Sequence, residues 1–202
     1  MRRLVLILAA ALVPALLVAQ KPPKAKTKLP STTLPAILGT FLADSGVATR
    51  GLPWTTGNTL PIKWKSAQPV PSQYTMYNGV TSERTGTTRF ATSDTSSIEA
   101  YVTVLGNTDG VQRFWVQWDM NEFPSERGDS LLLKAGFVLT PTKCSRATEG
   151  YSYGNLIMVV KAPGKKAAGL QEGWNCAQND CTVTVSLYYR KADAEKIECV
   201  GS

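Results

Sequence analysis

Two segments of this chain alternate strictly between apolar and polar side chains. In residues 182–189 every second position is apolar, beginning with Val183. In residues 111–120 the same period of two gives an apolar row, made of Phe114, Val116, Trp118 and Met120. The opposite row is made of Arg113, Trp115, Gln117 and Asp119. A period of two with β-branched and aromatic side chains is typical of a strand with one face in the core. Both segments are therefore predicted to be half-buried β-strands.

Segments of the same kind recur along the chain and are separated by Gly, Pro, Asn and Asp. The predicted strands span residues 62–66, 73–77, 87–92, 98–105, 111–120, 130–139, 155–161, 182–190 and 196–200. The loop 106–110 contains two glycines, so the strands that flank it are expected to form an antiparallel hairpin. The pattern predicts an all-β fold, an antiparallel β-sandwich or barrel of about eight or nine short strands with at most short helical turns.

The remaining segments are less regular. Residues 33–42 are apolar and fit either a first strand or a short helix. Residues 165–170 and 191–197 are each expected to form a helical turn or two. Residues 45–60 and 121–129 are predicted to be surface loops, because turn-forming and polar residues dominate them.

The beginning of the chain resembles a secretory leader. Arg2 and Arg3 precede an apolar run over residues 4–18, and Ala19 offers a cleavage position before Gln20. As a helix this run would cover about 22 Å, which is short for a hydrocarbon core of about 30 Å. Residues 1–19 are therefore predicted to be a cleaved signal peptide, which leaves no transmembrane span. An uncleaved anchor stays open as the alternative, because lysines follow the run directly.

The basic charge lies almost entirely at this end of the chain. Residues 20–32 are predicted to be a flexible tether rich in Pro and Lys, and residues 33–202 a single all-β domain. The tether could make a weak contact with an anionic surface through Lys21, Lys24, Lys26 and Lys28. Six of the 22 cations precede residue 31, so 16 cations face 15 acids in the rest of the chain. This near-neutral domain carries no basic footprint for nucleic acid.

All four cysteines lie in the last third of the chain, and an even number in an exported protein indicates disulfides. Of the three pairings, Cys176–Cys181 with Cys144–Cys199 is favoured. The first would close a tight turn around Asn179 and Asp180, and the second would tie the terminal segment to the body of the domain. The spacings lack the close pairs of a zinc site.

The chemistry of the chain is marked by an absence, since it contains no histidine. Serine–histidine and cysteine–histidine nucleophiles and histidine-ligated metals are therefore excluded. Residues 128–131 resemble the nucleophile motif of the Gly-Asp-Ser-Leu hydrolase family. That family places the motif near the mature N-terminus and uses a histidine partner, so its activity is not carried over. No cofactor is predicted, and an enzyme is less expected than a binding protein.

Trp115 marks the predicted binding surface. It shares a strand face with Arg113 and Gln117, and such an aromatic platform beside hydrogen-bonding groups suits a sugar ring or a partner surface. Trp54, in the preceding loop, is expected either to join this surface or to cover it. These four residues are the predicted ligand-binding set.

An acidic group follows the same strand. It consists of Asp119, Asn121, Glu122, Glu126 and Asp129. Converging oxygens would suit calcium, and a carboxylate pair would suit the hydrolysis of a glycosidic bond. Neither has diagnostic spacing, so a hydrophilic hairpin loop is the simpler interpretation and no metal site is predicted.

These features predict an exported, non-enzymatic β-domain of the periplasm, the cell envelope or the secreted fraction. Its expected ligand is an envelope protein, a glycan or a surface polymer. Two alternatives stay open. One is a small glycan hydrolase that uses the carboxylates of residues 119–129, and the other is a secreted hydrolase inhibitor that presents the Cys176–Cys181 loop.

Overall fold

The computed structural model describes residues 31–42, 52–70, 80–107, 110–144, 153–177 and 180–188, together with Cys199. One mixed but mostly antiparallel sheet contains all ten strands. The strands are β1 (Ser31–Thr32), β2 (Lys63–Trp64), β3 (Gln68–Pro69), β4 (Ser82–Ala91), β5 (Ser97–Asn107), β6 (Gly110–Asp119), β7 (Val138–Lys143), β8 (Tyr153–Lys161), β9 (Ala168–Ala177) and β10 (Asp180–Tyr188). The helices are α1 (Leu34–Phe41) and α2 (Ser125–Lys134).

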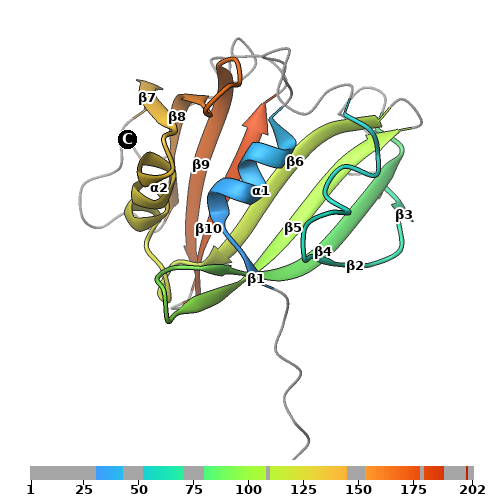
Figure 1. The fold of residues 1–202 in the computed structure, drawn as a ribbon, viewed down its shortest axis with the longest axis horizontal. Coiled ribbons are helices and arrows are strands. Elements are labelled where there is room, and N and C mark those ends of the chain that lie inside the picture. Colours follow the sequence, from blue (N-terminus) through green and yellow to red (C-terminus); the bar gives the residue numbers. More distant parts are fainter. Residues whose placement is uncertain are drawn as a thin grey trace, which may run out of the picture.

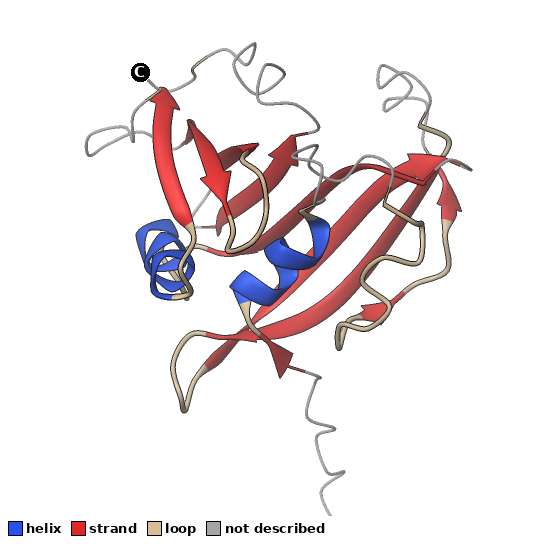
Figure 2. Cartoon of the chain, turned by 45° about the horizontal axis from the view of Figure 1, so that its top comes forward, coloured by secondary structure: helices blue, strands red, loops and turns tan. Residues whose placement is uncertain are grey.

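The order across the sheet is β1-β4-β5-β6-β10-β9-β8-β7, and β2 and β3 also pair with β4. The two end strands do not pair, so the sheet is open and does not close into a barrel. Figures 1 and 2 show the sheet bending around α1, which lies against its inner face. The predicted mainly antiparallel β architecture is confirmed, as is the hairpin of β5 and β6.

Helix α1 fills the inner face because its apolar residues recur at helical spacing. Leu34, Ile37, Leu38 and Phe41 are all fully buried. Thr33 caps the helix, since its Oγ1 accepts a hydrogen bond of 3.1 Å from the backbone N–H of Ala36. The Phe41 ring stacks on Phe114 of β6 with 4.1 Å between the ring centroids. Residues 33–42, for which the sequence left strand and helix open, therefore form a helix.

The inner face of the sheet is apolar along its central strands, as the alternation predicted. Phe114, Val116 and Trp118 of β6 are buried. The register places them directly opposite Leu187, Val185 and Val183 of β10, which are buried as well. Trp118 donates its indole N–H to the Phe123 carbonyl at 2.7 Å, so its polar atom has a partner within the core.

The chain builds the sheet from two similar halves. In each half a helix is followed by antiparallel strands: α1 precedes the short β2 and β3 and then β4, β5 and β6, and α2 precedes β7, β8, β9 and β10. The last strand of the first half, β6, pairs antiparallel with the last strand of the second half, β10. No sequence repeat predicted this arrangement.

Helix α2 corrects one prediction, since residues 130–139 were expected to be a strand and residues 121–129 a loop. Its buried residues are Ser125, Gly128 and Leu132, which recur at helical spacing. Gly128 allows close packing, because a Cβ there would lie 3.3 Å from Trp118 Cζ2. The helix ends where Gly136 adopts φ +82°, a conformation that glycine tolerates best. The three consecutive leucines suggested a strand, but the stop signal at Gly136 marks a helix.

Strand β9 corrects a second prediction, in which residues 165–170 formed a helical turn. Gly169, Gly173 and several amides lower the intrinsic strand preference of this segment. Its pairing with β8 on one side and β10 on the other overrides that preference.

Several predictions fall outside the described residues. These are the signal peptide over 1–19, residues 20–30 of the tether, the strand over 73–77, the turns over 191–197 and all of the 196–200 strand except Cys199. The last two tether residues, Ser31 and Thr32, form β1, which pairs parallel with β4. Neither helix of the described chain is long and apolar enough to cross a membrane.

Both predicted disulfides are confirmed, Cys144–Cys199 and Cys176–Cys181. Cys176 and Cys181 are direct partners across the β9–β10 hairpin, with 4.0 Å between their Cα atoms. This bond holds the end of the hairpin in register. With no free cysteine present, the disulfides indicate an oxidising environment.

Candidate functional site

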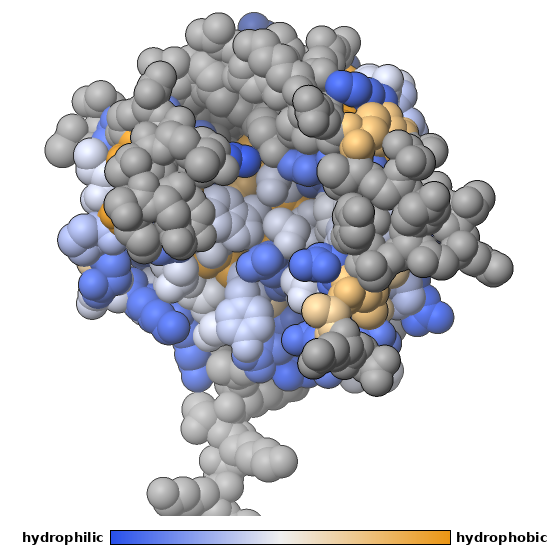
Figure 3. Space-filling model, turned by 180° about the vertical axis from the view of Figure 1, so that it is seen from behind, coloured by the Kyte–Doolittle hydropathy of each residue, from blue (hydrophilic) through white to orange (hydrophobic). Residues whose placement is uncertain are grey.

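The outer face of the sheet, opposite α1, is polar where its central strands meet. Gln117 of β6 pairs with Thr184 of β10, Thr184 pairs with Gly173 of β9, and Gly173 pairs with Asn155 of β8. Side chains of directly paired residues point to the same face of a sheet. The four residues therefore form one row across four strands. Figure 3 shows the molecule from this side, and hydrophilic side chains dominate its described surface.

Gly173 interrupts this row and leaves a hollow. A Cβ at Gly173 would meet only two backbone oxygens, those of Gly154 at 3.8 Å and Thr184 at 4.0 Å. These are ordinary van der Waals distances, so among the described residues nothing occupies the position of a Cβ there. The hollow has a volume of about 330 Å³.

Neutral hydrogen-bonding groups surround the hollow. It is lined by Gln117, Gly154, Asn155, Gln171, Gly173, Trp174, Asn175, Thr182 and Thr184. The set contains four side-chain amides and two hydroxyls, and no side chain in it carries a charge. Each amide offers both a carbonyl acceptor and N–H donors. The hollow can therefore exchange hydrogen bonds with an uncharged ligand that has donors and acceptors of its own.

One internal hydrogen bond orients the row. Gln117 Nε2 donates to Thr184 Oγ1 at 3.0 Å. The bond uses one of the two amide N–H groups of Gln117 and an acceptor lone pair of Thr184. The carbonyl oxygen of Gln117 and the hydroxyl proton of Thr184 stay able to bond a ligand. The pair thus presents an acceptor and a donor side by side.

Two aromatic side chains border the row. Tyr101 of β5 is the direct partner of Gln117 and is 53% exposed. Trp115 lies two residues before Gln117 on β6, on the same outer face, and is half-buried. A hydrogen bond with Glu99, together with the negative charge of that carboxylate, raises the pKa of Tyr101 above its ordinary value. The phenol therefore stays neutral across the physiological pH range.

The structure separates the predicted ligand-binding set into two places. Trp115, Arg113 and Gln117 lie together on the outer face of β6, and Gln117 borders the hollow. Trp54 lies with the core residues instead, where its ring packs over Gly106. Arg84 holds the Trp54 loop, since its guanidinium donates to the Trp54 carbonyl at 3.3 Å and lies 4.0 Å from the centroid of the Trp64 ring.

Sequence reasoning missed every lining residue of the hollow except Gln117, including Asn155 of β8 and Thr184 of β10. On β9 it missed Gln171, Gly173 and Asn175. The period-two spacing of these positions was the available signal. It was weak, because a glycine and amides seldom mark a strand. Their place became visible only once β9 paired between β8 and β10.

The acidic residues after β6 do not converge on one cavity. Asp119, Asn121, Glu122 and Glu126 are exposed. Glu122 borders a cavity on one side of α2, whereas Asp129 borders another beside β7 and β8. Asp119 Oδ1 accepts a hydrogen bond of 2.8 Å from the backbone N–H of Asn121, which closes the turn after β6. In the described part of the chain, no three acidic, cysteine or histidine side chains group closely enough to hold a metal ion.

Comparisons of the chain with protein-family models, with curated proteins and with solved structures find no match. The functional conclusion therefore rests on the geometry of the molecule.

Proposed function

We propose that this protein is an exported, non-enzymatic domain that binds a neutral glycan of the cell envelope or of the extracellular space. The observation that carries the proposal is the hollow at Gly173, which is walled by four amides and two hydroxyls and bordered by Tyr101 and Trp115. Export is supported by the leader-like residues 1–19 and by the two disulfides.

Sugars match the chemistry of the hollow because each sugar hydroxyl both donates and accepts hydrogen bonds. Amides and threonine hydroxyls do the same, so the two surfaces can satisfy one another without a charge. The volume of about 330 Å³ lies at the lower end of the range of about 300–1,000 Å³ that holds small ligands. A single sugar ring in the hollow, with the rest of the glycan running over Tyr101 and Trp115, fits this size.

Tyr101 and Trp115 supply the apolar contact that sugar binding needs. The C–H face of a sugar ring packs on an aromatic ring, which removes apolar area from water on both sides. Tyr101 is well placed for this role because it is more than half exposed and lies beside Gln117.

Binding is favoured over hydrolysis because none of the described residues that line the hollow has a side chain that can carry a proton to or from a glycosidic oxygen. Glycoside hydrolysis ordinarily needs two carboxyl groups that flank the bond. The described lining of the hollow supplies only amides, hydroxyls, glycines and Trp174, whose ring packs against the core on the inner face.

The substitution Gly173→Leu tests the proposal by filling the hollow. The wild-type protein is expected to bind neutral glycans on an array, and the best of these is then measured by calorimetry. Gly173→Leu should weaken that binding by at least about tenfold, because the leucine occupies the space of the ligand. Its melting temperature should stay near that of the wild type, since a Cβ at this position meets only two described backbone oxygens, both at ordinary van der Waals distances.

The matched control is Thr140→Leu, which adds the same side chain to the exposed edge strand β7, away from the hollow. This variant should bind as the wild type does. A wild-type protein that binds no neutral glycan, or a Gly173→Leu variant that binds as tightly as the wild type, would refute the proposal.

A further inference from the structure

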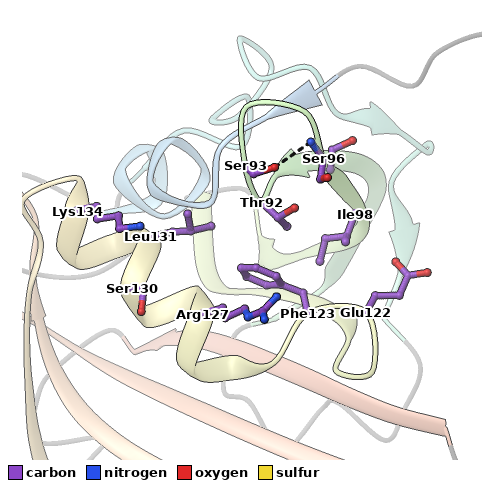
Figure 4. Close-up of a pocket in the computed structure, with 11 residues that line it drawn as sticks. Thr92, Ser93, Ser96, Ile98, Glu122, Phe123, Arg127, Ser130, Leu131 and Lys134 are labelled. Carbon is purple, nitrogen blue, oxygen red and sulfur yellow. Dashed lines mark hydrogen bonds between the residues drawn. The ribbon is translucent and has the colours of Figure 1, made fainter.

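A second cavity lies away from the hollow, between α2 and the turn that joins β4 to β5. It has a volume of about 550 Å³ and shares no lining residue with the hollow. Figure 4 shows its three sides: α2 with Arg127 and Lys134, the turn with Ser93 and Ser96, and Phe123 and Ile98 between them.

The cationic side of this cavity comes from α2. Arg127 and Lys134 are seven residues apart, which is about two helical turns, so both lie on the same face of the helix. Both are exposed and both line the cavity. Glu122, the acid in the lining, is drawn on the far side of the cavity from Lys134 in Figure 4.

The turn adds neutral donors. Ser93 Oγ accepts a hydrogen bond of 3.1 Å from the backbone N–H of Ser96. Ser97 Oγ accepts one of 3.0 Å from Arg89 Nε. Both bonds use acceptor lone pairs, so each hydroxyl keeps its proton for a ligand oxygen. Guanidinium, ammonium and hydroxyl donors on two sides of one cavity favour an oxyanion.

The cavity continues into an apolar extension. A neighbouring cavity of about 360 Å³ shares Thr92, Ser93, Leu131 and Lys134 with the first. Its other lining residues are Thr33, Pro35, Ala91, Asp94 and Ala135. The floor of the first cavity is apolar as well, with Phe123 4% exposed and Ile98 7% exposed. Lys134 thus lies at the junction of the two cavities, the polar first cavity and its mainly apolar neighbour.

We propose that this groove binds a small amphiphilic anion. Its carboxylate or phosphate head lies between Arg127, Lys134 and the serine hydroxyls, and its apolar tail lies along Leu131, Pro35 and Ala91. The site is independent of the glycan hollow, and either can exist without the other.

Calorimetry and NMR titration of the full chain test the proposal with four ligands: hexanoate, hexyl phosphate, hexanol and inorganic phosphate. Hexanoate or hexyl phosphate should bind at least about tenfold more tightly than hexanol, because only they carry the charged head. Hexyl phosphate should also bind more tightly than inorganic phosphate, because its tail leaves water. The stronger of the two anions identifies the head group.

The double variant Arg127→Gln with Lys134→Gln should weaken the binding of the better anion by at least about tenfold. The control variant is Lys161→Gln, which replaces an exposed lysine outside the groove and should not weaken this binding. Folding is monitored by the melting temperature, which should not fall since both cations are exposed. Equal affinity for hexanol and both anions, equal affinity of the double variant and the wild type, or no binding of either anion would overturn the proposal.

Discussion

The two faces of strands β6, β9 and β10 are built from alternate residues of the same segments, yet they differ in almost every property. On the inner face, Phe114, Val116 and Val185 are buried against α1 and the rest of the core. On the outer face, Gln117 and Thr184 share a hydrogen bond at the rim of a polar hollow. The inner face is packed into the core, whereas the outer face leaves a hollow. Stability should therefore depend on the first and ligand binding on the second.

The largest difference is expected between Phe114→Ala and Gln117→Ala, three residues apart on β6. Phe114 is fully buried and stacks on Phe41, so its truncation should cost about 3–5 kcal/mol of unfolding free energy. Gln117→Ala removes one partly buried hydrogen bond and should cost about 1 kcal/mol. Urea denaturation of both variants measures the two values. Similar losses would show that the faces do not divide the two roles.

A smaller effect is expected from isosteric exchanges at adjacent positions of β10. Val185→Thr buries a hydroxyl in the core and should cost about 1–3 kcal/mol. Thr184→Val exposes a methyl group and loses the bond from Gln117, which should cost less than about 1.5 kcal/mol. Thr184→Val should also weaken glycan binding. Val185→Thr should leave glycan affinity unchanged at temperatures where the variant stays folded. Unfolding curves and calorimetry together test both statements.

Gly154 and Gly173 differ in how much space an added side chain would find, so substitutions there should change stability in opposite directions. A Cβ at Gly154 would lie 2.3 Å from Trp174 Cζ2, so Gly154→Ala should destabilise the fold by about 1–3 kcal/mol. A Cβ at Gly173 meets no such obstacle, so Gly173→Ala should stabilise the fold by about 0.5–1 kcal/mol through lower chain entropy in the unfolded state. The sign of the change in melting temperature is the decisive measurement. Destabilisation by Gly173→Ala would mean that the hollow is already filled.

The smallest effect concerns pH. None of the described residues that line the hollow is charged. Glu99 raises the pKa of Tyr101, so the Tyr101 phenol stays neutral across the physiological pH range. Glycan affinity is expected to change less than about twofold between pH 6 and pH 9. Titration calorimetry in matched ionic strength checks this. A steep change within that range would point to a titrating group in contact with the ligand.

Part of the candidate site was predictable because it lies on a strand with a clear period of two. Alternation alone placed Trp115, Arg113 and Gln117 on one face of β6, and the structure agrees. It could not supply Gln171, Gly173 and Asn175, since the glycine that opens the hollow also weakens the strand signal of β9. Trp54 was predicted to belong to the ligand-binding set, but it lies with the core, and its loop is held by the Arg84 contact from another segment.

The helices show the same division. The spacing of Leu34, Ile37, Leu38 and Phe41 fits a helix. The short apolar segment 33–42 fits a strand as well, so the sequence left both open. The burial of this segment against the inner face of the sheet decided for the helix. For α2 the leucines suggested a strand, whereas the burial of Ser125, Gly128 and Leu132 at helical spacing, with Gly128 close to Trp118, favours a helix. Short apolar segments carry too little periodicity to settle this alone.

The sequence by itself determined the β architecture, the apolar rows of β6 and β10 and the pairing of the cysteines. The first two follow from local interactions, namely side-chain alternation and turn chemistry. The cysteine pairing was favoured from the spacing of four thiols, although Cys144 and Cys199 are 55 residues apart. Only the tertiary structure decided that the sheet is open, that two helix-led halves join at β6 and β10, and that Gly173 leaves a polar hollow in a row of hydrogen-bonding side chains. Those features depend on which strands become neighbours, and strand pairing is a long-range choice that no single segment encodes.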